Sequence, residues 1–171
     1  MNSLKSNSVL ILLLLAVFLL TGCQPVAQLY NGNVYKDAKT FSLDVTDTTS
    51  ADLETFEIKT SFSYRTSGPA LSISGTVAMG THYQLMYGRI RVFDLFLFFL
   101  DDDNRVIDGA RLYNTVNAFP EDTFRFEQEL MVPAGATQVA LGYEATFTSS
   151  DSRGTAGGGD WIYKLPLSSG K

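Results

Sequence analysis

The strongest constraint on the fold is a two-residue alternation of apolar and polar side chains that recurs along most of the chain. In its clearest case Phe56, Ile58, Thr60, Phe62 and Tyr64 share one face, while charged and hydroxyl side chains take the other. Successive side chains of a β-strand point to opposite faces of the sheet, so this pattern predicts a strand with one buried face.

Similar alternation, or an apolar run between turn residues, predicts the remaining strands. About eight are expected, and no segment has convincing helical periodicity. The fold class predicted is all-β: an antiparallel two-sheet β-sandwich, immunoglobulin-like or transthyretin-like, after an N-terminal signal helix that is removed. The expected strands begin near Thr40, Phe56, Leu71, Val92, Arg105, Phe124, Val139 and Trp161.

One of these segments differs from the rest, because Val92–Leu100 has apolar residues at nearly every position. A strand of this kind is central in its sheet and covered on both faces, either by its own chain or by a partner. Asp101–Asn104 follows it and predicts a hairpin turn, since Asp and Asn accept turn geometry and bond their own backbone.

The first 22 residues have the composition of an export signal. Lys5 supplies a basic start, and an unbroken apolar run of twelve residues, Val9 to Leu20, follows it. A membrane-spanning helix needs about 20 apolar residues, so the segment is expected to be cleaved rather than to remain as a span.

The tetrapeptide Leu20-Thr21-Gly22-Cys23 resembles the lipobox of bacterial lipoproteins. The resemblance implies cleavage between Gly22 and Cys23, and acyl chains such as palmitate on the sulfur and amine of Cys23. Two or more chains hold a protein stably on a membrane. The alternative is an ordinary secreted protein with one stray cysteine.

The resemblance also implies a location in the cell envelope. In bacteria with two membranes, the family's sorting rule directs a lipoprotein to the outer membrane unless aspartate follows the cysteine, and here Gln24 follows it. The periplasmic and the surface face both stay open, as does the envelope type.

Three divisions of the chain follow. Residues 1–22 are the signal peptide, residues 23–38 a lipidated tether with Pro25 and an Asn31-Gly32 turn, and residues 39–171 a single β-sandwich with a flexible loop at 149–159. Removing 22 of 171 residues leaves 149, which suits one domain with its own core.

Charge and composition exclude several functions. The mature part keeps 12 basic and 18 acidic side chains, a net charge of −6, and its basic residues are scattered, so nucleic acid is not an expected partner. A single histidine and a single, lipidated cysteine exclude the usual zinc, copper and iron sites, and no cofactor is expected.

Candidate chemistry is sparse. Asp101 and Asp103 are a candidate calcium site, although adjacent carboxylates in a hairpin more commonly face water. The sequence identifies no nucleophile or second group that could act with His82 as a general base. Ser168 and Lys171 match a Ser-x-x-Lys pattern without its companion motifs. Glu127 and Glu129 alternate outward from an apolar strand face, as solvated carboxylates do.

Aromatic and arginine side chains predict an interface instead. Arg89 and Arg91 share a strand face beside the most apolar stretch, a composition enriched at protein interfaces. The candidate interface residues are Tyr83, Tyr87, Arg89, Arg91 and Trp161. The segment Phe98–Asp102 resembles the signature of FxLYD-type domains, small β-sandwiches of bacterial lipoproteins, with Asp101 at the place of the tyrosine.

The function expected is therefore that of a membrane-anchored, non-catalytic module that binds another envelope protein. The alternative is a β-sandwich that binds a glycan or another small ligand at the envelope. A hydrolase is the least favoured class, because nothing in the sequence supplies a nucleophile together with a base.

Overall fold

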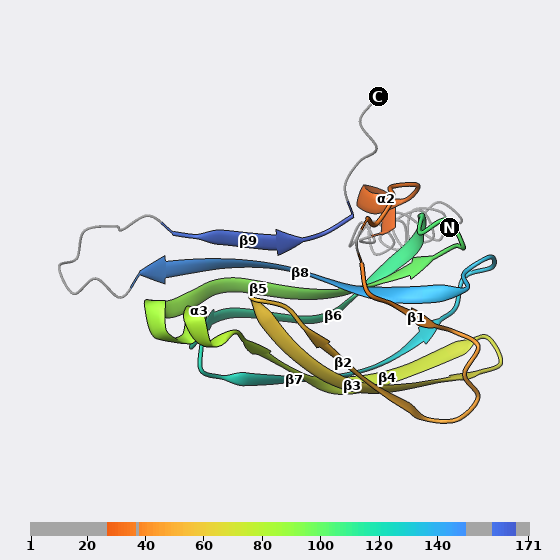
Figure 1. Ribbon diagram of the computed structural model, residues 1–171, viewed down its shortest axis with the longest axis horizontal. Helices are drawn as coiled ribbons and strands as arrows, with labels where there is room; N and C mark the ends of the chain where they lie inside the picture. The colour runs from red at the N-terminus through yellow and green to blue at the C-terminus, as the bar shows by residue number, and fades with distance from the viewer. Residues whose placement is uncertain (1–26, 37, 150–158, 167–171) are drawn as a thin grey trace, which may run out of the picture.

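The computed structural model describes residues 27–36, 38–149 and 159–166, and these form two antiparallel β-sheets packed face to face (Figure 1). One sheet has five strands in the order β1-β8-β5-β6, with β9 also paired to β8; the other has four in the order β2-β3-β4-β7. The β-sandwich predicted from the sequence is confirmed. In chain order the elements are α2 (Ala27–Tyr30), β1 (Thr40–Ser42), β2 (Thr49–Glu54), β3 (Ile58–Ser67), β4 (Ala70–Met79), α3 (Thr81–Met86), β5 (Tyr87–Leu100), β6 (Val106–Ala118), β7 (Thr123–Met131), β8 (Gln138–Ser149) and β9 (Trp161–Lys164).

Strand β3 shows how the alternation becomes a core. Ile58, Thr60, Phe62 and Tyr64 are all buried between the sheets, as the pattern predicts. Phe56 was expected on the same face, but it precedes the strand in a turn and is 66% exposed. The turn forms because Thr55 Oγ1 accepts hydrogen bonds from the backbone N–H groups of the two following turn residues, Glu57 and Ile58.

Two features of the chain were not expected. Strand β2 pairs along β3 at the edge of the four-stranded sheet, and only its Leu53 is buried, so it lacks a strong apolar signal. Helix α3 and the single turn α2 correct the expectation of no helix. Helix α3 has six residues, with Gly80 as its N-cap, and is too short to show a period of 3.6.

Strand β5 is the centre of the five-stranded sheet, paired on one side to β6 and on the other to β8. Phe93, Leu95, Leu97 and Phe99 belong to the core between the sheets. The alternate residues Phe96, Phe98 and Leu100 form a second apolar cluster on the opposite face. The prediction of a strand covered on both faces is confirmed from residue 95 to 100, whereas Val92 is 36% exposed and Asp94 is partly exposed on the outer face.

The outer cover of β5 comes from residues 27–36, which we call the N-terminal strap. Tyr30 and Tyr35 pack edge-on against Phe98, with ring centroids 5.3 and 5.7 Å away, and Tyr35 is only 2% exposed. The strap was expected to be a loose tether ending at residue 38. Its described part is instead folded onto the sheet, so the packed domain begins before the expected boundary at residue 39.

Backbone and side-chain hydrogen bonds fix the strap. The Gly32 N–H donates to the Val106 carbonyl, and the Tyr35 N–H donates to the Asn104 carbonyl. The Tyr35 hydroxyl lies 2.9 Å from the carbonyl oxygens of both Leu141 and Lys164, so it links the strap to β8 and β9.

Glycine at position 142 makes room for this contact. A Cβ there would lie 2.6 Å from a ring carbon of Phe98, 2.8 Å from the Lys164 carbonyl oxygen and 3.1 Å from the Tyr35 hydroxyl. Any other residue would therefore push the strap or β9 away from the sheet.

We expect Tyr35→Phe to lower the free energy of unfolding by about 1 kcal/mol, because the buried ring stays while its hydroxyl bond is lost. Urea unfolding followed by far-UV circular dichroism measures the change. Tyr163→Phe, which removes the hydroxyl of a 54% exposed tyrosine, is the matched control and should change stability by less than about 0.5 kcal/mol. Equal effects of the two substitutions would contradict the role given to Tyr35.

Candidate functional site

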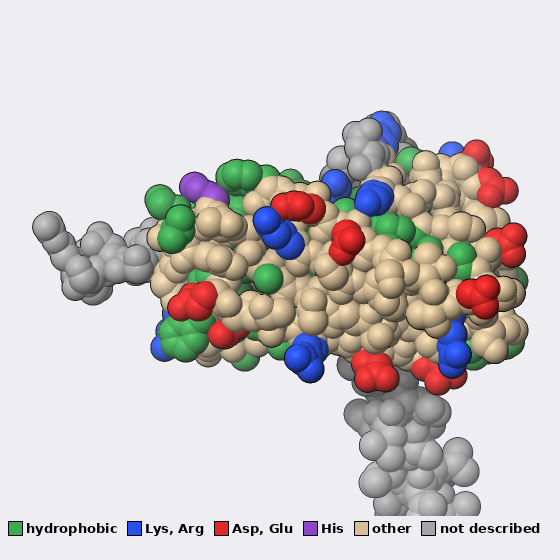
Figure 2. All heavy atoms as spheres, turned by 60° about the horizontal axis from the view of Figure 1, so that its bottom comes forward, with side chains coloured by type: hydrophobic (Ala, Val, Ile, Leu, Met, Phe, Trp, Pro, Cys, Tyr) green, Lys and Arg blue, Asp and Glu red, His purple; other side chains and the backbone are tan. Residues whose placement is uncertain are grey.

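Exposed apolar side chains gather at one end of the sandwich. Three connections meet there: the β2–β3 turn, helix α3 between β4 and β5, and the β6–β7 turn. Figure 2 shows green apolar side chains beside the purple His82 at this end. We call this surface the α3 end and define it by Phe56 (66% exposed), His82, Leu85 (79%), Met86 (56%) and Phe119 (45%).

Local geometry forces these side chains outward. Tyr83 occupies the one buried position of α3, and on so short a helix Leu85 and Met86 are left outside. Gly80 allows the β2–β3 turn to approach, because a Cβ at that position would lie 2.2 Å from the Phe56 carbonyl oxygen. The rings of Phe56 and His82 then lie 5.3 Å apart on the surface.

The β6–β7 turn brings Phe119 to this end, where it lies beside Arg89 of β5. The Phe119 N–H donates to the Asp122 carboxylate, which closes the turn. The Arg89 guanidinium lies 4.6 Å from the centroid of the Phe119 ring and donates to the Asn117 carbonyl at 3.2 Å. An arginine held over an exposed aromatic ring is a common component of protein interfaces.

The five residues predicted to form an interface differ in exposure and do not lie on one surface. Tyr83 is 8% exposed and its ring stacks on that of Phe147 at 5.1 Å, so it is part of the core. Tyr87 is half-buried beside it, while Arg89 and Arg91 are exposed at the start of β5. Trp161 is exposed too, but it lies on β9, on the outer face of the five-stranded sheet.

Four of the apolar residues at the α3 end were missed in the sequence. Leu85 and Met86 lie in the apolar stretch from His82 to Leu100, before the strand expected from Val92, and no element was predicted for them. One signal in the sequence could have located the helix: apolar and polar residues stop alternating between Gly80 and Tyr87, the segment that α3 occupies. Phe56 and Phe119 gave no such signal, because each sits one or two residues outside a strand.

Tyr87 connects the α3 end to the segment before β9. Its hydroxyl donates to the Asp160 carboxylate. This hydrogen bond is the main cause that raises the pKa of Tyr87 to about 12, and burial and the negative charge of Asp160 act in the same direction.

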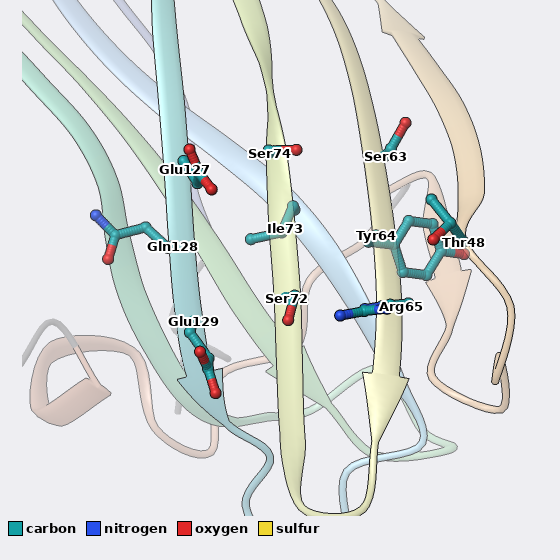
Figure 3. A pocket seen from close by; sticks show the side chains of 10 residues that line it. All are labelled: Thr48, Ser63, Tyr64, Arg65, Ser72, Ile73, Ser74, Glu127, Gln128 and Glu129. Atoms are coloured by element: carbon teal, nitrogen blue, oxygen red, sulfur yellow. The ribbon is translucent and has the colours of Figure 1, made fainter.

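A shallow polar groove lies on the outer face of the four-stranded sheet (Figure 3). Ser72 and Ser74 of β4 lie along its floor, Glu127 and Glu129 come from β7, and Arg65 extends from β3 toward β4. The groove encloses about 360 Å³. Its hydroxyl, guanidinium and carboxylate groups can hydrogen-bond a polar ligand, and both glutamates are exposed, as the outward alternation predicted.

The acidic hairpin between β5 and β6 is closed by its own carboxylate. Asp101 Oδ1 accepts hydrogen bonds from the backbone N–H groups of Asp103 at 2.9 Å and Arg105 at 2.8 Å. Asn104 completes the turn with a positive φ of 59°. Asp101 therefore serves the turn itself, and the side chains of Asp102 and Asp103 face solvent.

Within the described ranges 27–36, 38–149 and 159–166, no group of three or more His, Cys, Asp or Glu side chains is placed to hold a metal ion. Neither helix in those ranges has the length and hydropathy that a membrane span requires. Residues 1–26, with Gly22 and Cys23, and residues 167–171, with the Ser168 pattern, lie outside the described residues, as does most of the expected 149–159 loop.

Comparison with known proteins adds no relative. A scan of the sequence against models of protein families finds no match. A search of curated proteins finds none that matches either.

We predict that Asp160→Asn lowers the pKa of Tyr87 toward its ordinary value of 10.0. Because the pKa is raised in the folded state, the stabilisation from this bond is full below pH 10 and is lost as the pH rises through about 12. Titration of tyrosinate absorbance, with the variant compared against the wild type, measures the shift.

Tyr87→Phe is the control for that titration, since it removes the late-ionising group. In the Tyr87→Phe background, Asp160→Asn should act only on Tyr83, whose pKa the negative charge of Asp160 also raises, though less than burial does. Tyr35 and Tyr143, present in both proteins, ionise later than Tyr87, so the comparison is made near pH 12. A wild type that differs from Tyr87→Phe only by one tyrosine ionising near pH 10 would contradict the hydrogen bond.

Proposed function

We propose that this protein is a lipid-anchored component of the bacterial cell envelope, and that its β-sandwich binds another envelope protein through the α3 end. The observation that carries the proposal is the gathering of exposed apolar side chains at that end. Large exposed apolar surfaces on soluble domains mark interaction sites, because leaving them in water costs free energy that a partner recovers.

The anchor and the α3 end lie at opposite ends of the domain in this proposal. The packed domain begins at Ala27, four residues after Cys23, and four residues span at most about 14 Å. Tyr30 packs on Phe98, near the far end of β5 from α3. The 14 residues of β5 extend for roughly 46 Å, so the α3 end would point away from the membrane that holds the acyl chains.

The chemistry of the α3 end favours a protein partner. Aromatic, methionine and arginine side chains are enriched at the centres of protein interfaces, and this end has Phe56, Phe119, Met86 and Arg89. The acidic balance of the mature chain disfavours polyanions such as nucleic acid as partners. The mode of action proposed is binding, with no catalytic step.

We expect Leu85→Asp to reduce capture of the partner by about tenfold or more when intact cells are crosslinked and the protein is purified in mild detergent. Met131→Asp is the matched control, since Met131 is also exposed, at 68%, but lies at the end of β7 remote from α3. Both side chains are solvated, so neither variant should lose its fold. Equal capture by the wild type and Leu85→Asp would contradict docking through the α3 end.

Cys23→Ser tests the anchor separately. The wild type should incorporate labelled palmitate and fractionate with membranes, and the variant should do neither, because serine offers no thiol to acylate. A variant that is still cleaved before residue 23 and still membrane-bound would refute lipidation at Cys23. Outer-membrane location in a two-membrane cell is checked by density-gradient separation of the same extracts.

A further inference from the structure

The outer face of the five-stranded sheet is divided into a covered and an open half. The N-terminal strap covers Phe96, Phe98 and Leu100, whereas the half toward α3 has no cover among the described residues. We call this second half the open face. It carries the outward side chains of four neighbouring strands: Trp161 and Tyr163 of β9, Glu144 and Thr146 of β8, Val92 and Asp94 of β5, and Asn114 and Val116 of β6.

Strand register arranges these side chains in two rows. Trp161 is paired with Thr146, Thr146 with Val92, and Val92 with Val116. The second row runs in the same way through Tyr163, Glu144, Asp94 and Asn114. Neighbouring strands are about 4.8 Å apart, so each row crosses roughly 14 Å of sheet.

At one end of both rows is a pair of exposed aromatic rings. Trp161 is 59% and Tyr163 54% exposed, and their ring centroids are 5.0 Å apart. The Trp161 Nε1–H donates to Glu144 Oε1 at 3.1 Å, which restrains the indole against the sheet. The aromatic faces are thus held in place before any ligand arrives.

A fixed set of polar groups lies on β5 and β6, with strand β8 between them and the rings. Asp94 Oδ1 accepts a hydrogen bond from Asn114 Nδ2 at 2.9 Å and an ion-paired contact from Arg111 Nε at 3.1 Å. The Asp94 side chain is only 14% exposed, so this network is better shielded from solvent than an ordinary surface pair. The second Asp94 oxygen and the terminal nitrogens of Arg111 have no partner in these contacts and can bond a ligand.

We propose that the open face binds a neutral polysaccharide chain, with sugar rings stacked on Trp161 and Tyr163 and hydroxyls bonded by the Asp94, Asn114, Arg111 and Glu144 side chains. A pyranose has one apolar C–H face and a rim of hydroxyls, which matches exposed rings beside fixed donors and acceptors. The carboxylates and the formal net charge of −5 disfavour an anionic polymer.

This site is independent of the α3 end, because none of its residues belongs to that surface. It does not require Cys23 to be acylated either. A second copy of the chain, pairing through Trp161 and Tyr163, is the competing occupant, and the experiment separates it from a glycan.

The test uses the full-length protein in a detergent without a sugar headgroup. Cellohexaose and chitohexaose are the neutral probes, and a hexamer of galacturonate is the anionic one. Trp161 is the only tryptophan in the chain, so a change in tryptophan fluorescence reports directly on the open face. Calorimetry supplies the affinity of variants, and light scattering supplies the oligomeric state.

The expected result is saturable binding of at least one neutral hexamer, weakened about tenfold by Tyr163→Ala and changed less than about twofold by Phe119→Ala. Phe119 is the matched control, an aromatic ring 45% exposed at the other surface. Trp161→Phe, which keeps a ring but loses the bond to Glu144, should fall between them.

Four results would overturn the proposal. They are no fluorescence change or heat with either neutral hexamer at a few millimolar, equal weakening by Tyr163→Ala and Phe119→Ala, tighter binding of the anionic hexamer, and a dimer that dissociates in Tyr163→Ala. None of these results bears on capture of a protein partner through the α3 end.

Discussion

Burial of both faces of β5 is the constraint on which the rest of the structure depends. The second sheet covers one face, as in any sandwich. The other face carries Phe96, Phe98 and Leu100, which a five-stranded sheet open to water would expose. The N-terminal strap removes them from solvent, and each large side chain buried in this way contributes about 1.5 to 3 kcal/mol. The strap therefore completes the core and is not an appendage to it.

This constraint also determines where ligands can reach the five-stranded sheet. The cluster covered by the strap ends at Phe96, so the outer face from there toward α3 has side chains exposed to water. The same strand that needs a cover at one end thus presents a solvent-facing surface at the other. A break in its register allows this, because the bulge between Ile90 and Val92 turns both Ile90 and Phe93 inward and leaves Arg91 and Val92 outside.

The sequence predicted the strands whose own pattern of apolar and polar residues shows which side chains are buried. Alternation located β3, β4 and β8, and the continuous apolar run identified β5 as doubly covered. Strand β2 was missed because an edge strand with one buried leucine needs no apolar pattern. The strap was missed because the burial of Tyr35 depends on Phe98 and Gly142, which are distant in sequence and adjacent only in the fold.

Candidate surface residues were predicted less well, for a related reason. Residue type indicated that Trp161 and Arg89 could be displayed, and both are exposed. Tyr83 has similar residue types near it in the sequence, but it is buried in the core, because its ring stacks on that of Phe147. Whether a side chain faces inward depends on the path of the backbone, and the six-residue helix α3 directs Leu85 and Met86 outward in a segment for which no element was predicted.

The hydroxyl of Tyr35 has a consequence for the order in which the molecule can form. It joins residue 35 to residue 164, across 129 positions of the chain. Contacts of such long range are made late, because a very large loop must close first. A polypeptide delivered N-terminus first cannot finish this domain while its last strand is still inside the translocation channel. In the export that we propose, the arrangement keeps the chain incompletely folded until transport is over, which is the state that passage through a narrow pore requires.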